Sequence, residues 1–288
     1  MRTELDCVPC FVRQTLDSLR RVTMDEAVQE KVLRTVLKAA SDMDLRQSPP
    51  AMGQFVHRLI RAETGDPDPY REVKQRQNRL ALELYPRLAQ RVRCASDPLG
   101  AALRLAAAGN VIDLGVKSGV EESQIAEAIE ASLEAPLEGG ALDSFRRAAE
   151  LGRDILYIGD NAGEIVLDRL LIEVLGPARV TFVVRGSPVI NDAVMADAEA
   201  SGMTALVKVI DSGSDAPGTI LEDCSADFCA RFRGAALVLA KGQGNYETLS
   251  GVERHMFFLL RVKCAVVTRH IGVPTGSLVL AEHSPGGR

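Results

Sequence analysis

Hydrophobic residues recur at helical spacing through the first half of the chain. In residues 25–40, Val28, Val32 and Val36 share one stripe, with charged residues opposite. The run Ser48–Pro50 breaks the chain and can start the next helix. This pattern predicts helices over residues 11–22, 25–40, 51–65, 71–88 and 97–110.

The pattern changes in the second half, where short apolar or β-branched runs alternate with helical stretches. Strands are predicted over residues 154–159, 179–186, 205–213, 235–244 and 264–270, with helices over 164–176, 191–202 and 219–234. Such alternation is typical of a parallel sheet covered on both faces. We therefore predict an α/β fold: a three-layer, doubly wound, mostly parallel sheet with an α-helical N-terminal subdomain. The linker-like segment 133–140 divides it into residues 1–140, helical, and residues 141–288, the metal- and phosphate-binding α/β domain.

Polar residues follow the predicted strands, at the edge where open α/β sheets bind ligands. They are Asp160 and Asn161 after the first strand, Arg185 after the second with Asn191 and Asp192 close behind, Asp211 to Ser214 after the third, and Lys241, Gly242 and Asn245 after the fourth. Carboxylate and amide oxygens suit a hard divalent cation, whereas arginine, lysine and a glycine-rich turn suit a phosphate. Together they indicate metal-assisted phosphoryl chemistry.

Each of these features also has a purely structural interpretation. Asn161 and Glu164 match a capping box, which needs no function, and the glycines of 241–245 match a turn. The dinucleotide fingerprint is absent, because Asn161 stands where its second glycine belongs. Polar residues follow four predicted strands and should meet at one edge of the sheet. This placement favours a functional site over these local explanations.

Composition and charge argue against nucleic-acid-binding and membrane-associated functions. The formal net charge of -5 lacks the basic surplus of a nucleic-acid-binding protein. Neither a signal peptide nor an apolar run long enough to span a membrane is visible, which predicts a cytoplasmic protein without a membrane partner. Cys7 and Cys10 alone have close metal-like spacing; metal binding, a redox role and simple packing all remain open for them.

Nine ordered motifs make the chain similar to one family. They are "CVPC" (7–10), "SPP" (48–50), "GDPDPYREVK" (65–74), "GNVIDLG" (109–115), "GDNAGEIVLD" (159–168), "VRGSPVINDA" (184–193), "GSDAPGT" (213–219), "AKGQGNYE" (240–247) and "LLRVKCAVV" (259–267). In these motifs the chain resembles the DUF89 family of damage-control phosphatases, also called ARMT1-like. It is most similar to the microbial subfamily marked by an N-terminal CxxC. The matches run nearly end to end, which makes the resemblance specific.

The resemblance implies a metal-dependent phosphomonoester hydrolase that acts on small, sugar-phosphate-like metabolites, in a role of metabolite damage control. It implies a divalent ion (magnesium, manganese, cobalt or nickel) on Asp160, Asn161 and Asp192, which with Lys241 form the catalytic set. The implied substrate- and phosphate-binding residues are Arg185, Lys241, Gly242, Asn245, Glu164, Asn110 and Asp113. Direct attack by water and a phospho-enzyme on a carboxylate are both compatible with this set.

Two other function classes compete with this interpretation. One is an S-adenosylmethionine-dependent carboxyl methyltransferase, which binds its cofactor without needing a metal. The other is a non-catalytic metal- or metabolite-binding protein, which takes up metal without turnover. The sequence gives no expectation for the oligomeric state.

Overall fold

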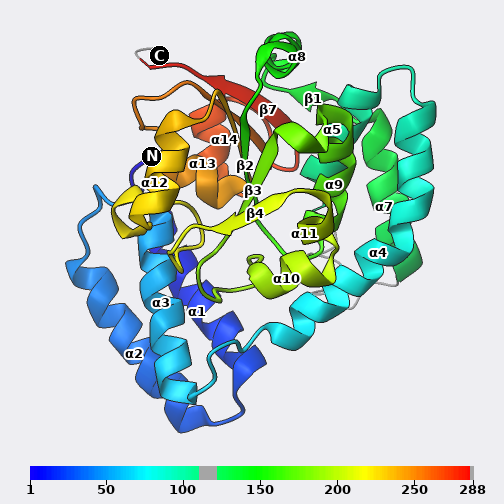
Figure 1. Cartoon of the computed structure of the whole chain (residues 1–288). Coiled ribbons are helices and arrows are strands. Elements are labelled where there is room, and N and C mark those ends of the chain that lie inside the picture. Colours follow the sequence, from blue (N-terminus) through cyan, green and yellow to red (C-terminus); the bar gives the residue numbers. More distant parts are fainter. Residues whose placement is uncertain (110–121, 286–288) are drawn as a thin grey trace.

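A seven-stranded mixed sheet forms the centre of the computed structural model, which describes residues 1–109 and 122–285 (Figure 1). Its strands are β1 (Leu137–Glu138), β2 (Ile155–Ile158), β3 (Val180–Val184), β4 (Lys208–Asp211), β5 (Leu237–Lys241), β6 (Met256–Arg261) and β7 (Leu278–His283). Their order is β1-β7-β6-β5-β2-β3-β4, and every pair is parallel except β6 with β7. The predicted fold class, a three-layer, mostly parallel α/β sheet, is confirmed.

Successive apolar side chains of the strands lie on opposite faces of the sheet and belong to two separate cores. On β2, Ile155 and Tyr157 join one buried cluster, whereas Leu156 and Ile158 join another on the opposite face. Successive strand residues point to opposite faces, so a fully apolar strand needs cover on both. That requirement produces the three layers.

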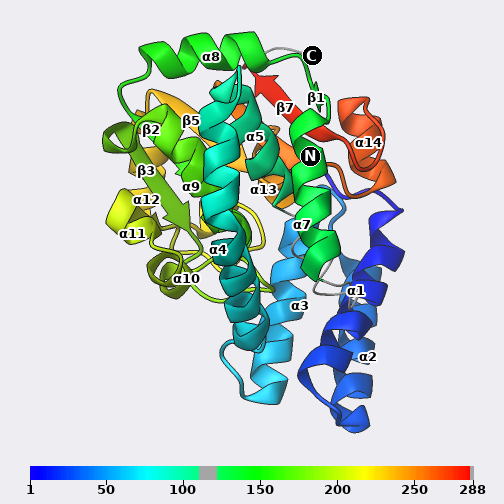
Figure 2. The ribbon, with the colours of Figure 1, turned by 90° about the vertical axis from the view of Figure 1, so that its right-hand side faces the viewer.

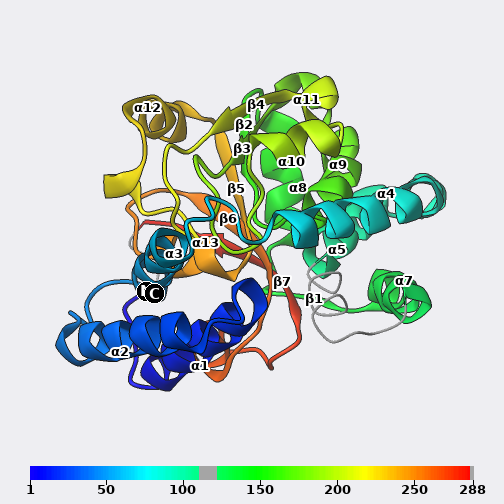
Figure 3. The ribbon, with the colours of Figure 1, turned by 90° about the horizontal axis from the view of Figure 1, so that it is seen from below.

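Helices provide this cover on both faces of the sheet. The larger core packs against α4 (Arg71–Cys94), α5 (Pro98–Ala108), α7 (Glu122–Ala131), α8 (Leu142–Leu151) and α9 (Glu164–Leu175). The opposite core packs against α12 (Ala226–Gly234), α13 (Gln243–Leu249) and α14 (Ala265–Ile271). Figure 2 shows α4, α5 and α9 side by side, and Figure 3 shows α12 and α13 across the sheet from them. Two short helices, α10 (Met195–Ala200) and α11 (Met203–Leu206), lie between β3 and β4.

The first three helices form a third apolar cluster beside the sheet. They are α1 (Cys7–Val22), α2 (Glu26–Asp42) and α3 (Pro49–Thr64), drawn in blue in Figure 1. Val266 of α14 belongs to this cluster, which therefore connects the helical part to the sheet domain. Each of the five predicted N-terminal helices is present. None of the helices in the described parts of the chain is both long and apolar enough to span a bilayer.

One predicted strand is wrong. Residues 264–270 were expected to extend the sheet, but they form helix α14, and the preceding apolar run Met256–Arg261 forms β6 instead. β6 already pairs with β5 on one edge and β7 on the other, so no free edge remains for a strand there. Val266 and Val267 are buried on the helix instead, since packing overrides the β propensity of valine.

The linker-like segment 133–140 contains the short edge strand β1, which pairs with β7. The largest core cluster takes residues from both sides of it, including Leu105 and Phe257. The division into residues 1–140 and 141–288 stays a prediction.

Candidate active site

Eight candidate residues meet at the carboxyl ends of β2, β3 and β5, three adjacent strands. They are all buried: Asp160, Asn161, Glu164, Arg185, Asp192, Lys241, Gly242 and Asn245. Burying this many polar groups is costly unless they satisfy one another, so their pairing defines the site.

Asn161 and Asp192 lie opposite each other in an isolated antiparallel bridge. The Ala162 N–H donates to the Asn191 carbonyl at 2.8 Å, and the Ala193 N–H donates to the Asp160 carbonyl at 2.8 Å. Helix α10 begins only at Met195, later than predicted, so Asp192 sits on an extended segment rather than at a helix start. Main-chain hydrogen bonds thus bring the two segments with predicted metal ligands together.

The Asn161 side chain points into the site. Its amide nitrogen donates to Asp160 Oδ2 at 2.9 Å and to Glu164 Oε1 at 2.8 Å. The N-cap of α9 is Gly163, with a left-handed φ of 76°. The capping-box interpretation of Asn161 and Glu164 is therefore wrong. Asn161 lies two residues before the N-cap, and its side-chain amide donates hydrogen bonds to the carboxylates of Asp160 and Glu164.

Lys241 lies between two carboxylates of α9. Its Nζ is 3.1 Å from Glu164 Oε2 and 3.1 Å from Asp168 Oδ1. The Tyr157 hydroxyl donates to the same Asp168 oxygen at 2.7 Å. Asp168 is fully buried, and its Oδ2 has no hydrogen-bond partner among the described residues. Lys241 is therefore held in place by the charges of Glu164 and Asp168.

Arg185 connects the remaining residues. Its Nε donates to Asp192 Oδ2 at 2.7 Å, and its Nη1 donates to Asn245 Oδ1 at 3.3 Å. Its Nη2 lies 3.7 Å from Asp160 Oδ1, too far for a hydrogen bond, and has no hydrogen-bond partner in the described part of the chain. Asn245 in turn donates to the Gly159 and Lys241 carbonyls at 3.1 and 2.6 Å. Within the described residues, Arg185 thus keeps its Nη2 group, near Asp160, without a hydrogen bond.

The pKa values of the buried ionisable groups in the site differ from their usual values. Burial, followed by the charges of Glu164 and Asp192, raises the pKa of Asp160 to about 8. Burial also raises the pKa of Asp192, although Arg185 opposes the shift. Burial alone would lower the pKa of Lys241, but Asp168, Glu164 and Asp160 outweigh it, so the net shift is upward. Lys241 therefore stays protonated, while the acids need more positive charge to ionise together.

Gly242 lets the β5–α13 turn pass close to Asp160. Its φ of 85° is left-handed, and a Cβ there would lie 2.0 Å from Asp160 Oδ2. Only glycine fits this position. A small cavity opens beside it, lined by residues that include Asp160, Lys241, Gln243 and Lys263.

Three residues of the site escaped the sequence analysis. Asp168 carried a signal, since it stands one turn after Glu164 on an otherwise apolar helix. Lys263 follows β6 and its charge opposes the raised pKa of Asp160, but it directly precedes the predicted strand 264–270 and so followed no predicted strand end. Asn78, far away in sequence, accepts from the Gly163 N–H at 2.7 Å. No local pattern could reveal a contact made by a distant helix.

Of the other four predicted residues, two are not described and two lie on α1. Asn110 and Asp113 are outside the described residues. Cys7 and Cys10 occupy the first turn of α1, and burial is the main cause that raises the pKa of both thiols. Raised pKa values oppose thiolate formation and hence redox reactivity. A metal or redox role for this pair stays a prediction.

The donor set fits a divalent cation. Asp160 and Asp192 face each other across a network that raises the pKa of both, and a cation between them would offset their repulsion. Across residues 1–109 and 122–285, no three His, Cys, Asp or Glu side chains converge as a metal site. Two carboxylates plus the Asn161 amide would therefore supply the protein ligands, leaving the other coordination positions to water or substrate.

Comparison with known proteins identifies the family. The family model of the damage-control phosphatase ARMT1-like domain matches residues 3–279. The chain belongs to this family. The resemblance inferred from the motifs is confirmed, and the match spans both the helical part and the sheet.

Relatives of similar length come from archaea. An uncharacterised protein of Methanocaldococcus jannaschii is 34% identical, covering 96% of this chain and 94% of its own. A damage-control phosphatase of Pyrococcus horikoshii is 30% identical, with 97% of each chain covered. One of Archaeoglobus fulgidus is 31% identical over 95% of this chain and 96% of its own. A crystal structure of the Pyrococcus horikoshii DUF89 protein superposes with a TM-score of 0.90 at 29% identity, covering 99% of this chain and 100% of that one.

Proposed function

We propose that this protein is a metal-dependent phosphatase that hydrolyses small phosphorylated metabolites, sugar phosphates among them. One observation carries the proposal. Two carboxylates and an amide at adjacent strand ends lie beside a buried lysine and a buried arginine. A cation site next to a phosphate site is what metal-assisted phosphoryl transfer requires. The names of two relatives support damage control rather than methyl transfer.

Asp160, Asn161 and Asp192 would hold the divalent cation. When bound, the cation supplies Lewis-acid activation of the phosphoryl group and of the attacking nucleophile. Magnesium, manganese, cobalt and nickel are all compatible with oxygen ligands of this kind.

Lys241 and Arg185 would bind the phosphoryl oxygens. Lys241 is held in place by Glu164 and Asp168, and Arg185 by Asp192 and Asn245, so neither has to reorganise when negative charge develops. Such fixed cations stabilise the transition state more than mobile ones do. The Gly242 turn would bring backbone N–H groups near the same oxygens.

The test is hydrolysis of a generic aryl phosphate with and without added magnesium, manganese, cobalt or nickel. We expect metal-dependent turnover by the parent protein and none by Asp160→Ala, with an unchanged circular dichroism spectrum. Full activity in Asp160→Ala would refute the assignment. Absence of turnover with every metal, together with calorimetric binding of S-adenosylmethionine, would favour the methyltransferase. Metal uptake without turnover would favour a binding protein.

A further inference from the structure

A buried polar network joins α4 to the loops of the site. Lys74 Nζ lies 2.8 Å from Asp68 Oδ2 and 3.3 Å from Asp197 Oδ2. Lys74 is only 2% exposed and Asp197 5%. Buried ion pairs add little stability compared with apolar packing, so this network calls for another explanation.

Asn78 extends the network, one turn further along α4. Its Nδ2 donates to Asp197 Oδ1 at 2.9 Å, and its Oδ1 accepts from the Gly163 N–H at 2.7 Å. Asp197 Oδ2 also accepts from the Val194 N–H at 3.0 Å. The side chains of Asn78 and Asp197 therefore connect the N–H groups of Gly163 and Val194, which belong to different loops.

Those backbone groups adjoin the predicted metal ligands. Gly163 stands two residues after Asn161, and Val194 stands two residues after Asp192. The Asn78–Asp197 hydrogen bond therefore links the two ligand loops through their Gly163 and Val194 N–H groups. This side-chain link therefore adds to the main-chain hydrogen bonds that join the two loops.

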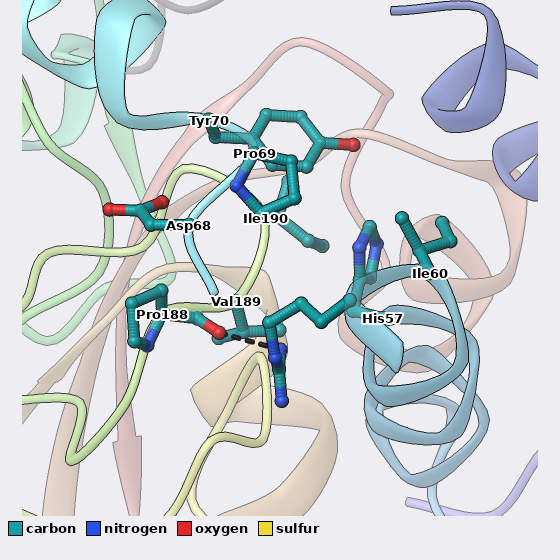
Figure 4. A pocket seen from close by; sticks show the side chains of 9 residues that line it. His57, Ile60, Asp68, Pro69, Tyr70, Pro188, Val189 and Ile190 are labelled. Atoms are coloured by element: carbon teal, nitrogen blue, oxygen red, sulfur yellow. Dashed lines mark hydrogen bonds between the residues drawn. The ribbon is translucent and has the colours of Figure 1, made fainter. Parts of the chain in front are cut away.

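The loop before Asp192 is held in an unfavourable conformation. Ile190 has a φ of 46°, which a β-branched residue rarely adopts. Figure 4 shows Pro188, Val189 and Ile190 around a small cavity, together with Asp68 and Pro69 from the connection between α3 and α4. Arg61 holds the loop from α3 by donating to the Pro188 carbonyl at 2.6 Å. Strain of this kind persists only where surrounding contacts impose the geometry.

We propose that Asn78 and Asp197 are positioning residues that set the distance between the Asp160–Asn161 loop and the Asp192 loop, and thereby the affinity for the divalent cation. The proposal rests on the metal-dependent function above. It gives the "GDPDPYREVK" segment, residues 65–74, a supporting role, because its Asp68 and Lys74 form the buried network with Asp197. Groups that orient metal ligands without touching the metal change its affinity by about 10- to 100-fold when removed.

The test compares manganese binding by isothermal titration calorimetry in the parent, Asn78→Asp and a swap variant, Asn78→Asp/Asp197→Asn. The single change keeps the acceptor for Gly163 but sets two carboxylates against each other, and we expect the manganese Kd to rise at least about tenfold. The swap restores a donor facing an acceptor at unchanged net charge, and we expect most of the affinity to return. The metal concentration for half-maximal phosphatase activity should shift in parallel.

Thr15→Val is the control, because it removes a buried hydrogen bond to the Phe11 carbonyl in α1, away from the site. We expect it to lower thermal stability without changing the manganese Kd. Should Asn78→Asp not fold, Asp197→Asn alone replaces it, with weaker binding again expected. Parent-like affinity in the single variants, or no recovery in a folded swap variant, overturns the positioning role alone. Failure of the parent itself to bind or use any metal instead overturns the proposed function.

Discussion

Lys241 Nζ lies 3.1 Å from Asp168 Oδ1, and both side chains are almost completely buried. The lysine therefore serves two purposes. It compensates buried negative charge on α9, and under the proposed function it binds phosphate.

Lys241→Met should impair both stability and activity. Removing one partner of a buried ion pair costs about 3–5 kcal/mol, because the remaining charge stays uncompensated. Urea denaturation should show a loss of this size, and phosphatase activity should fall at least about 100-fold. The double variant Lys241→Met/Asp168→Asn should regain much of the stability and none of the activity. Lys208→Met, at an exposed position on β4, is the matched control and should change neither.

Gly242→Ala should disrupt the site through a clash. The added methyl group would lie 2.0 Å from Asp160 Oδ2 on a backbone with a φ of 85°. We expect a loss of about 1–3 kcal/mol in the free energy of unfolding, with a loss of metal-dependent turnover. Gly251→Ala adds the same methyl group where nothing lies within 4 Å, and it should leave activity unchanged. Equal activity in the two variants would contradict the close approach of this turn to Asp160.

Arg185→Lys should not preserve function, although it keeps the charge. Arg185 contacts Asp192 and Asn245 through different nitrogens of one planar group, a geometry that an ammonium cannot reproduce. We expect KM for the aryl phosphate to rise and kcat to fall. Steady-state kinetics at saturating metal would measure both, and parent-like constants would argue against a phosphate contact by Arg185.

Glu247 should make stability depend on pH. Burial raises its pKa from 4.5 to about 7, while Gln243, Lys263 and the Met1 amino group oppose the shift. Between these two values the folded protein binds a proton that the unfolded chain releases. Stability contributed by this group is therefore full below pH 4.5 and declines as the pH rises toward 7.

Glu247→Gln removes this titration. The variant should gain stability relative to the parent as the pH rises from 5 to 8, by at most about 3 kcal/mol, since one pKa unit corresponds to about 1.4 kcal/mol. Urea denaturation of both proteins at the two pH values measures the difference. A stability difference that does not grow with pH would show that Glu247 ionises as easily in the folded protein as in the unfolded chain.

The sequence by itself determined the α/β class, the family and most of the residues that meet at the candidate site. Strand periodicity and turn residues are local properties, and carboxyl ends of parallel strands must share an edge, so Asp160, Arg185 and Lys241 could be placed together without coordinates. The same local reasoning failed at residues 264–270. Valines there suggested a strand, but the pairing of β6 with β5 and β7 left no edge for one.

Only the tertiary structure decided which side chains complete the site. The capping alternative for Asn161 failed because Asn161 pairs with Asp192 in a β-bridge and α9 is capped by Gly163. Asn78 and Asp197 are separated by 119 residues, yet they hydrogen-bond across the two ligand loops. Such pairings depend on how α4 packs against the sheet domain. Packing is a property of the whole chain, whereas periodicity and turn chemistry belong to short segments.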